Sequence, residues 1–398
     1  MVFTKYLAKY KRLMNTGELT LFIMSEEGAA ILREIRNSDQ RWFHEHQPQW
    51  KYNPFAGTEM KDSRMFTGYR AELKRFISYV DRGESTFITG PVGIGKSSFI
   101  KHATGILPPE EFRSIYIERP PKGIKDVFHA ILQTFDRDVN DASLGLLRTV
   151  VSTLTEFNAK VKTILILDEL GDSGIDVLKW LRTLFDSAEL TPIISGPSET
   201  LGVINQKHFP LADRVFKTIL LGGFNKEETY EFVNRRIRSV CIESDFNGGK
   251  TTGICSGEKG NCTLCYSPFT ADTIDELYST SGGNPRLLLQ LSGLVMDYAL
   301  ANRIHKLQLD DVIRVVKSRN QALYGNLTPS QKEIIQVLLK KGPATSVLIA
   351  DSTKSSVGST LNQLNELVER NIVLRSGTTR SFEYTLTPEM QRYLQKGV

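Results

Sequence analysis

The 398-residue sequence has few cysteines and no long hydrophobic run. No apolar stretch approaches the roughly 20 residues of a membrane-spanning helix, which excludes that class and a membrane partner. The early apolar run at 19–24 is too short for a signal peptide and is followed by acidic residues, so we expect an intracellular, cytoplasmic protein. All four cysteines lie between residues 241 and 265, which confines thiol chemistry to that segment.

The composition is that of a soluble globular protein, with 40% hydrophobic and 24% charged residues. A chain of this length is too long for one ordinary core, so we expect two to three domains. The net charge of +5 is mildly basic, which is compatible with a polyanionic partner without identifying one.

A phosphate-binding loop is predicted between an apolar run at 85–89 and a helical pattern at 97–103. Its spacing is G-x-x-x-x-G-K-[ST], in which glycines let backbone N–H groups converge on phosphate and the helix adds its positive end. We expect ATP here, with Lys96 on the β- and γ-phosphates and the Ser97 hydroxyl as a Mg²⁺ ligand. The predicted nucleotide contacts are Gly90, Pro91, Val92, Gly93, Ile94, Gly95, Lys96, Ser97 and Ser98.

Short apolar strands alternate with helices from residue 54 to 222. This order predicts an α/β domain with a parallel sheet covered on both faces. We place strands at 85–89, 114–118, 163–169, 191–195 and 217–221. Helices are expected at 71–80, over a long stretch of about 124–160, and at 174–187.

Two carboxylates, Asp168 and Glu169, end an all-apolar strand. This places them at the carboxyl edge of the sheet, where open α/β folds bind ligands. We predict that Asp168 holds Mg²⁺ through water and that Glu169 orients and deprotonates the attacking water. A solvated strand end is the alternative interpretation, but a position about 70 residues after a phosphate loop favours the functional one.

The order of these motifs, followed by the polar-tipped strand at 192–199 and residues 211–215, resembles an AAA+ ATPase. Gly282-Gly283-Asn284-Pro285-Arg286 resembles the second sensor of one clade. That clade holds archaeal and eukaryotic replication initiators, transposition regulators and secretion ATPases. Residues 52–55 and 66–73 resemble the clade's segment that packs near adenine, which implies a nucleotide contact for Tyr69. The resemblance covers residues 52–320.

The resemblance implies roles for three further side chains. Ser195 becomes the first sensor, Arg286 the sensor of the γ-phosphate in the same subunit, and Arg214 an arginine finger acting on a neighbouring subunit. The arginine fork matches phosphate oxygens, although a surface salt bridge is the alternative for Arg214. Ser195 departs from the more common Asn or Thr. Residues 170–171 depart from the Ala-Gln of the secretion and transposition branches.

A helical lid is predicted at 223–322, with helices at 226–237, 269–278, 285–301 and 310–317. An insertion at 241–265 carries Cys241, Cys255, Cys262 and Cys265. The polar residues around them cannot build an apolar core, whereas four thiolates around one Zn²⁺ would order the segment. Disulfides and an iron–sulfur cluster are the alternatives.

Residues 323–398 have a helix–helix–helix–hairpin pattern that resembles a winged helix-turn-helix. The helices are placed at 329–340, 344–350 and 356–370, and the strands at 372–375 and 382–386. The predicted DNA contacts are Lys354, Ser355, Ser359, Thr360, Asn362, Gln363, Arg375 and Arg380. The segment from 325 on is only mildly basic, with nine Lys or Arg against six Asp or Glu, so a protein-binding winged helix is the alternative.

Residues 1–53 form a predicted helical extension with a Trp and His cluster at 42–50, for which packing is favoured over metal binding or base stacking. For the whole chain we predict an ATPase that binds duplex DNA and resembles an archaeal replication initiator. It would self-associate through the AAA+ domain, hydrolyse ATP slowly and lie on the nucleoid, with a helicase or transposase as protein partner. A transposition regulator and a signalling ATPase whose winged helix binds protein are the alternatives, and a secretion ATPase is disfavoured.

Overall fold

The computed structural model describes residues 53–55, 65–118, 121–137, 143–158, 161–170, 173–198, 200–207, 217–239, 267–304, 306–370, 372–378 and 381–396. Within these ranges, no helix combines the length and the apolar character that a bilayer crossing requires. The predicted N-terminal extension before residue 53 and the cysteine insertion lie outside the described residues.

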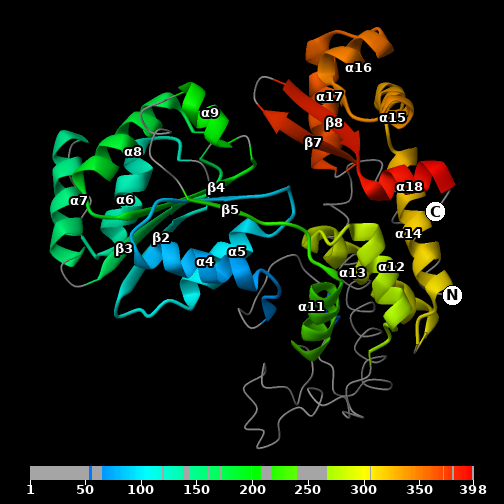
Figure 1. The fold of residues 1–398 in the computed structure, drawn as a ribbon, viewed down its shortest axis with the longest axis horizontal. Helices are drawn as coiled ribbons and strands as arrows, with labels where there is room; N and C mark the ends of the chain where they lie inside the picture. The colour runs from blue at the N-terminus through cyan, green and yellow to red at the C-terminus, as the bar shows by residue number, and fades with distance from the viewer. Residues whose placement is uncertain are drawn as a thin grey trace, which may run out of the picture.

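Five parallel strands form the central sheet in the order β2-β3-β4-β1-β5 (Figure 1). They are β1 (Thr86–Thr89), β2 (Phe112–Ile117), β3 (Lys162–Leu167), β4 (Thr191–Gly196) and β5 (Lys217–Leu220). Every pairing within this sheet is parallel. The predicted α/β fold with a parallel sheet is confirmed.

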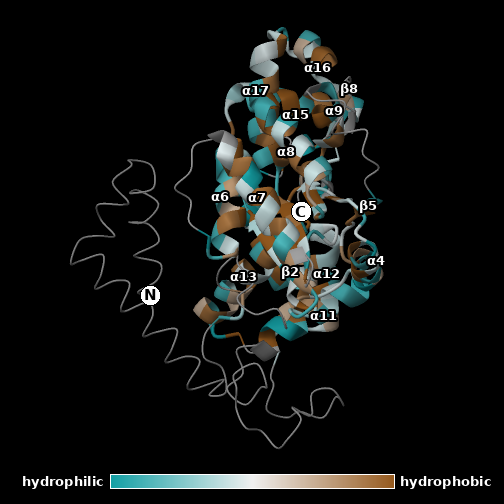
Figure 2. Ribbon diagram, turned by 90° about the vertical axis from the view of Figure 1, so that its left-hand side faces the viewer, coloured by the Kyte–Doolittle hydropathy of each residue, from teal (hydrophilic) through white to brown (hydrophobic). Residues whose placement is uncertain are grey.

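Helices cover both faces of the sheet, and successive residues of a strand serve opposite faces. Ile88 packs with α4 (Arg70–Asp81) and α5 (Lys96–Gly105), whereas Phe87 packs with the helices of the other face. Those are α6 (Ile124–Thr134), α7 (Ser143–Asn158), α8 (Ile175–Ser187) and α9 (Thr200–Lys207). Figure 2 shows the mixture of hydrophobic and hydrophilic residues along α6, α7 and α8 that such one-sided burial requires.

The long helical stretch predicted at about 124–160 consists of two helices. α6 ends at Thr134, and Asp136 adopts a left-handed backbone conformation with φ 52°, which breaks the helix. α7 begins at Ser143, and Phe135 stacks on Phe157 at a ring separation of 4.5 Å. The break lets two shorter helices pack on the sheet side by side.

Four further helices follow the sheet: α11 (Lys226–Ser239), α12 (Ala271–Ser281), α13 (Pro285–Asn302) and α14 (Leu309–Gly325). Their buried residues belong to the same hydrophobic cluster as the α4 and α5 face of the sheet. Leu288 and Val295 on α13 contribute to this cluster together with Phe76 and Phe99. The predicted helical lid therefore shares one core with the nucleotide-binding side of the sheet.

The C-terminal unit contains the predicted order of three helices and a hairpin. Its elements are α15 (Pro329–Lys341), β6 (Ala344–Thr345), α16 (Ser346–Thr353), α17 (Val357–Glu369), β7 (Val373–Thr378), β8 (Ser381–Leu386) and α18 (Pro388–Lys396). Two features differ from the prediction. Residues 344–345 form a strand that pairs with β8, and a further helix, α18, ends the unit.

α18 joins the C-terminal unit to the four-helix region, and we call this junction the α18 contact. Arg392 donates to Glu276 Oε1 at 3.2 Å and to Ser279 Oγ at 2.7 Å, both on α12. A second pair, Arg319 on α14 and Glu389 on α18, lies 2.5 Å apart and is largely buried. Figure 1 shows α18 lying beside α14.

Candidate functional site

The phosphate loop lies between β1 and α5, at the carboxyl edge of the sheet. Gly90, Gly93 and Gly95 have φ angles of 154°, 80° and 92°, which L side chains rarely adopt. A Cβ on Gly90 would lie 2.5 Å from the Leu221 carbonyl oxygen. The glycines of the motif therefore allow backbone angles and close contacts that residues with a Cβ would not.

Lys96 is the first residue of α5, and its side chain folds back over the loop. Its Nζ donates to the carbonyl oxygens of Gly90 at 2.8 Å and of Pro91 at 3.2 Å. The ammonium group therefore lies over the loop whose N–H groups are predicted to bind phosphate. A phosphate at this loop would meet both a fixed positive charge and the N-terminal end of α5.

Asp168 is the centre of a hydrogen-bonded cluster at the ends of three strands and the start of α5. Its carboxylate is 5% exposed. Ser97 Oγ donates to Oδ2 at 2.7 Å, Tyr116 Oη donates to the same oxygen at 2.8 Å, and Ser195 Oγ donates to Oδ1. The structure thus brings together three of the predicted residues, Ser97, Asp168 and Ser195, around one carboxylate.

The strand register explains why these groups meet. Leu167 pairs with Ile194, so Asp168 and Ser195 are the next residues on adjacent strands. Tyr116 pairs with Ile166, which lies two residues before Asp168 and so points to the same face of the sheet. Burial and the neighbouring Asp168 carboxylate both raise the pKa of Tyr116, so its hydroxyl remains a neutral donor.

Glu169 lies next to Asp168 and points its side chain into solvent. Its backbone is left-handed, with φ 54°, and its N–H donates to the Ser195 carbonyl oxygen at 3.0 Å. A positive φ is unusual for a residue with a long side chain and is found where the surrounding structure imposes it. The turn separates the two carboxylates, one buried among hydroxyls and the other exposed.

The residues present fit a magnesium ion. Mg²⁺ takes hard oxygen ligands, usually one or two from the protein with water and phosphate completing the shell. Ser97 and Asp168 offer such oxygens beside the phosphate loop. Because Ser97 donates its proton to Asp168, the lone pairs of Ser97 Oγ remain available for the ion.

Tyr69, predicted to contact the nucleotide, links three segments of the site. Its side chain is 5% exposed, and its hydroxyl lies 2.7 Å from the Ile94 carbonyl oxygen and 3.0 Å from that of Gly222. Burial and the nearby Glu228 raise the pKa of Tyr69. Its hydroxyl thus joins the phosphate loop to the segment after β5, and its ring lies against Phe224 at 5.5 Å.

The segment that resembles a second sensor packs directly on the phosphate loop. Asn284 caps α13 by accepting from the N–H groups of Arg286 and Leu287, and its Nδ2 donates to the Val92 carbonyl oxygen at 2.9 Å. The Arg286 N–H also lies 3.2 Å from the Gly93 carbonyl oxygen. A Cβ on Gly93 would lie 2.9 Å from Asn284 Oδ1, so this contact leaves no room for a side chain. The Arg286 side chain is exposed, and its Cβ lies next to Gly93 of the loop.

Sequence reasoning missed two residues of this site. No motif marks Tyr116. The signal that could have found it is the alternation of side chains along β2, which puts Tyr116 on the same face of the sheet as Asp168 after β3. Asn284 was read only as part of the Gly-Gly-Asn-Pro run, although an Asn before Pro at a helix start is a strong N-cap signal. Arg214, Arg380 and the four cysteines lie outside the described residues, and elsewhere no cluster of three or more His, Cys, Asp or Glu could hold a metal.

The residues predicted to contact DNA divide into two groups. Lys354, Ser355, Ser359, Asn362 and Arg375 are exposed. Thr360 is wrong as a DNA contact because it is 1% exposed and faces the core of the C-terminal unit. Gln363 is half-buried, and its Oε1 is enclosed within the unit. Helical periodicity places every third or fourth residue of α17 on the core side, and Thr360 shares that side with Leu364 and Leu367.

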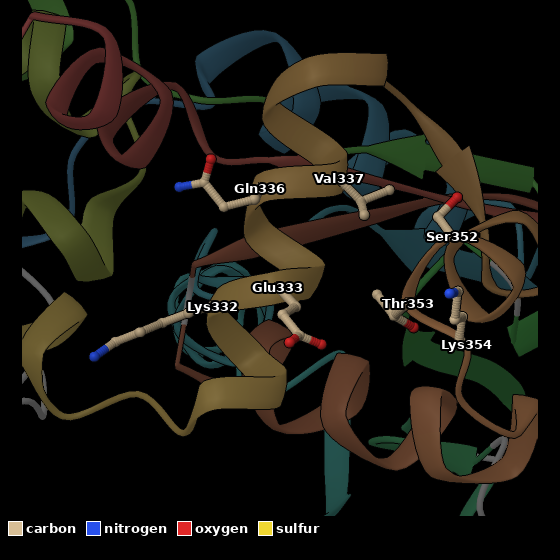
Figure 3. A pocket seen from close by; sticks show the side chains of 7 residues that line it. All are labelled: Lys332, Glu333, Gln336, Val337, Ser352, Thr353 and Lys354. Carbon is tan, nitrogen blue, oxygen red and sulfur yellow. The ribbon is translucent and has the colours of Figure 1, made fainter.

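A hollow of about 390 Å³ lies between α15 and the end of α16 (Figure 3). Glu333 and Val337 point from α15 toward the residues at 352–354, whereas Lys332 and Gln336 extend to the other side of the helix. The lining combines Lys354 with the carboxylate of Glu333, so it does not form a uniformly basic surface.

Comparison with known proteins supports the interpretation of the central part of the chain. Residues 80–204 match the family described as AAA domain. An uncharacterized HTH-type transcriptional regulator of Methanocaldococcus jannaschii is 20% identical over 401 residues, which cover 88% of this chain and 93% of that protein.

Solved structures were compared with the whole fold. A Walker-type ATPase of Pyrococcus abyssi has a TM-score of 0.52 at 17% identity, covering 86% of this chain and 100% of the other. The ORC2 protein of Aeropyrum pernix has a TM-score of 0.49 at 13% identity, covering 88% of this chain and 94% of the other. At these identities the likeness to the P. abyssi structure establishes a shared fold.

Proposed function

We infer that the chain binds ATP with Mg²⁺ and hydrolyses it, because residues 80–204 match the family described as AAA domain. Lys96 and the backbone of the phosphate loop would hold the phosphates. Ser97 and Asp168 would hold Mg²⁺, which shields phosphate charge and orients the γ-phosphoryl group. Glu169, exposed beside this pair, would accept a proton from the attacking water.

We further propose that the chain is an ATP-dependent DNA-binding switch of the replication-initiator type, in which the C-terminal unit binds duplex DNA. Lys354 and Ser355 lie exposed in the turn before α17, and Ser359 and Asn362 lie exposed in its first half, where a recognition helix meets base edges and phosphates. Arg375, whose guanidinium lies 4.7 Å from the Phe382 ring, would contact the backbone from the hairpin.

One observation supports the switch: the C-terminal unit is attached to α12 near the same end from which the chain turns to contact the nucleotide loop. Arg392 of α18 binds Glu276 and Ser279 near the end of α12. Three residues after Ser279 the chain enters the turn that leads to Asn284, which bonds to the phosphate loop. A nucleotide that moves this loop therefore acts on the helix to which the C-terminal unit is attached.

The test is duplex-DNA binding by the full chain, with ATP, with ADP and without nucleotide, over a salt series. The proposal expects affinity that depends on ATP and falls steeply with salt, because phosphate contacts release counterions. Asn362→Ala with Lys354→Ala should weaken binding, whereas Lys317→Ala, an exposed lysine on α14 and so outside α17, should not. Absence of wild-type binding under every nucleotide would leave a signalling ATPase that recognises protein.

Sequence-specific gene regulation is a second candidate, favoured by the relative from M. jannaschii, whose description is that of an HTH-type transcriptional regulator. The two roles differ in where the protein binds. Footprinting on genomic fragments separates them, because a regulator protects sites beside promoters and an initiator protects repeated sites at one origin. Filaments on nonspecific DNA would instead mark a transposition regulator.

Zinc binding and self-association remain proposals drawn from the sequence. We propose that the four cysteines at 241–265 bind one structural Zn²⁺ and that Arg214 acts on the nucleotide of a neighbouring subunit. Metal analysis should find about one zinc per chain, released by a thiol-modifying reagent. Arg214→Ala should lower ATP turnover only at protein concentrations that permit assembly, and equal loss at all concentrations would contradict the finger role.

A further inference from the structure

Asp168 accepts hydrogen bonds from three hydroxyls, and one donor, Tyr116, comes from a strand that the nucleotide motifs do not include. Tyr116 Oη lies 2.8 Å from Oδ2, the oxygen that also accepts from Ser97 at 2.7 Å. Ser195 donates to the other oxygen, Oδ1. All three donors are neutral, so they orient the carboxylate without neutralising its charge.

The position of Tyr116 is fixed on several sides. Its backbone is held in β2, in register with Ile166 of β3. Lys101 Nζ lies over its ring, 5.3 Å from the centroid, and Lys101 is itself paired with Glu118 at 2.6 Å. The ring also packs against the hydrophobic cluster on the α5 face of the sheet. The hydroxyl is therefore delivered to Asp168 by a side chain with little freedom to move.

The Tyr116 hydroxyl limits the acceptor positions that remain on the Asp168 carboxylate. A carboxylate offers about four lone-pair positions, two on each oxygen. Ser97 and Tyr116 occupy both positions on Oδ2, and Ser195 occupies one on Oδ1. Among the hydrogen bonds of the described residues, one position remains, on Oδ1. Without the Tyr116 hydroxyl, each carboxylate oxygen has one donor and one open position. The carboxylate can then rotate, because neither oxygen is held by more than one hydrogen bond.

We propose that Tyr116 is a positioning residue for Mg²⁺ at the nucleotide site, setting the orientation in which Asp168 and Ser97 receive the ion. This inference rests on the proposed binding of ATP with Mg²⁺. Side chains that hydrogen-bond to a metal ligand orient it and commonly change metal affinity by about 10–100-fold when they are replaced. A tyrosine that serves only packing would have no such effect on metal affinity.

Tyr116→Phe separates the two roles, because it retains the ring and the Lys101 contact and removes only the hydroxyl. The affinity of the full chain for a fluorescent ATP analogue is measured in EDTA and across a magnesium titration. We expect the half-saturating Mg²⁺ concentration to rise about tenfold. Affinity in EDTA should equal that of the wild type, because the phosphate loop is unchanged.

Tyr79→Phe is the matched control: Tyr79 lies on α4, where its ring is covered by Arg82 at 5.6 Å, and it should behave as the wild type. In an Asp168→Asn background, Tyr116→Phe should have no further effect on the magnesium titration, because the positioned carboxylate is gone. A circular dichroism melt without nucleotide confirms that each variant is folded.

Two results overturn the inference alone: an unchanged magnesium titration for Tyr116→Phe, or an equal loss of affinity in EDTA and in magnesium. A wild type that binds the nucleotide analogue in neither condition overturns the proposed function as well. A magnesium-dependent wild type with a normal Tyr116→Phe variant leaves the proposed function standing and removes Tyr116 from the metal site.

Discussion

Two adjacent residues, Asp168 and Glu169, have the same charge and very different surroundings. Asp168 is buried among three hydroxyls, whereas Glu169 is turned outward by a left-handed backbone whose N–H is held by Ser195. A buried carboxylate with fixed donors suits an ion held in place, and an exposed one suits proton transfer. This division predicts different phenotypes for the two positions.

Glu169→Gln should retain ATP binding and lose hydrolysis. General-base catalysis contributes about 10²- to 10⁴-fold, so kcat should fall by that range. The affinity for ATP, measured by equilibrium titration, should change little because the phosphate loop and Ser97 are untouched. A variant that hydrolyses ATP at the wild-type rate would remove Glu169 from the reaction.

Gly90→Ala should damage the loop. The new Cβ would lie 2.5 Å from the Leu221 carbonyl oxygen, and the φ of 154° is one that alanine rarely adopts. We expect a loss of about 1–3 kcal/mol in the free energy of unfolding and weaker ATP binding. Gly105→Ala is the control, because nothing lies within 4 Å of its Cβ position and Gly105 is helical. Urea denaturation measures both variants.

At the scale of an element, α17 shows where sequence patterning was sufficient and where it was not. The helix predicted at 356–370 begins at Val357, with Ser356 as its N-cap, and its apolar stripe and its place before the hairpin are as predicted. Thr360 was assigned to the DNA side because it is polar, but its position in the helix puts it with Leu364. Residue type alone therefore does not tell which face of a helix is exposed, because a polar side chain such as Thr360 can occupy a buried position.

Thr360→Val should therefore stabilise the protein or leave it unchanged, without affecting DNA binding. Thr360 Oγ1 is buried without a hydrogen-bond partner among the described residues, and a methyl group of similar size removes that cost of about 1 kcal/mol. Thermal unfolding measures the gain. Asn362→Ala, on the exposed side, should give the opposite result: unchanged stability and weaker DNA binding.

α18 carries a carboxylate whose ionisation opposes its burial. Burial raises the pKa of Glu389 above the ordinary value of 4.5, and the attraction of Arg319 does not fully offset this. Because the folded pKa exceeds the unfolded one, Glu389 stabilises the fold most below pH 4.5 and less as the pH rises through the folded pKa. Glu389→Gln should remove that part of the pH dependence. Unfolding free energies of both proteins across pH test the sign.

At the scale of the whole molecule, the parallel strands and the site motifs were predictable because apolar strands and glycine loops are local signals. The break at 136, the strand β6 and the helix α18 were not, because each depends on packing against distant residues. The α18 contact is the clearest case. Arg392 and Glu276 are 116 positions apart, and nothing in either neighbourhood marks them as partners.

Arg392→Ala should uncouple ATP binding at the phosphate loop from DNA binding by the C-terminal unit. In the wild type we expect ATP to change DNA affinity by about 5- to 150-fold, the range of ordinary coupling between sites. The variant should lose most of that factor while each ligand still binds alone. Arg82→Ala, which removes an exposed arginine that ends α4 and pairs with Glu84, should retain that factor. Titration of each ligand with and without the other measures the factor.

Coupling of this kind has no preferred direction. If the phosphate loop transmits ATP binding through α12 to the C-terminal unit, then DNA on that unit must hold ATP more tightly by the same factor. The end of α12, which both contacts share, would then link the two lifetimes: bound DNA slows the dissociation of the nucleotide, and the loss of DNA speeds it.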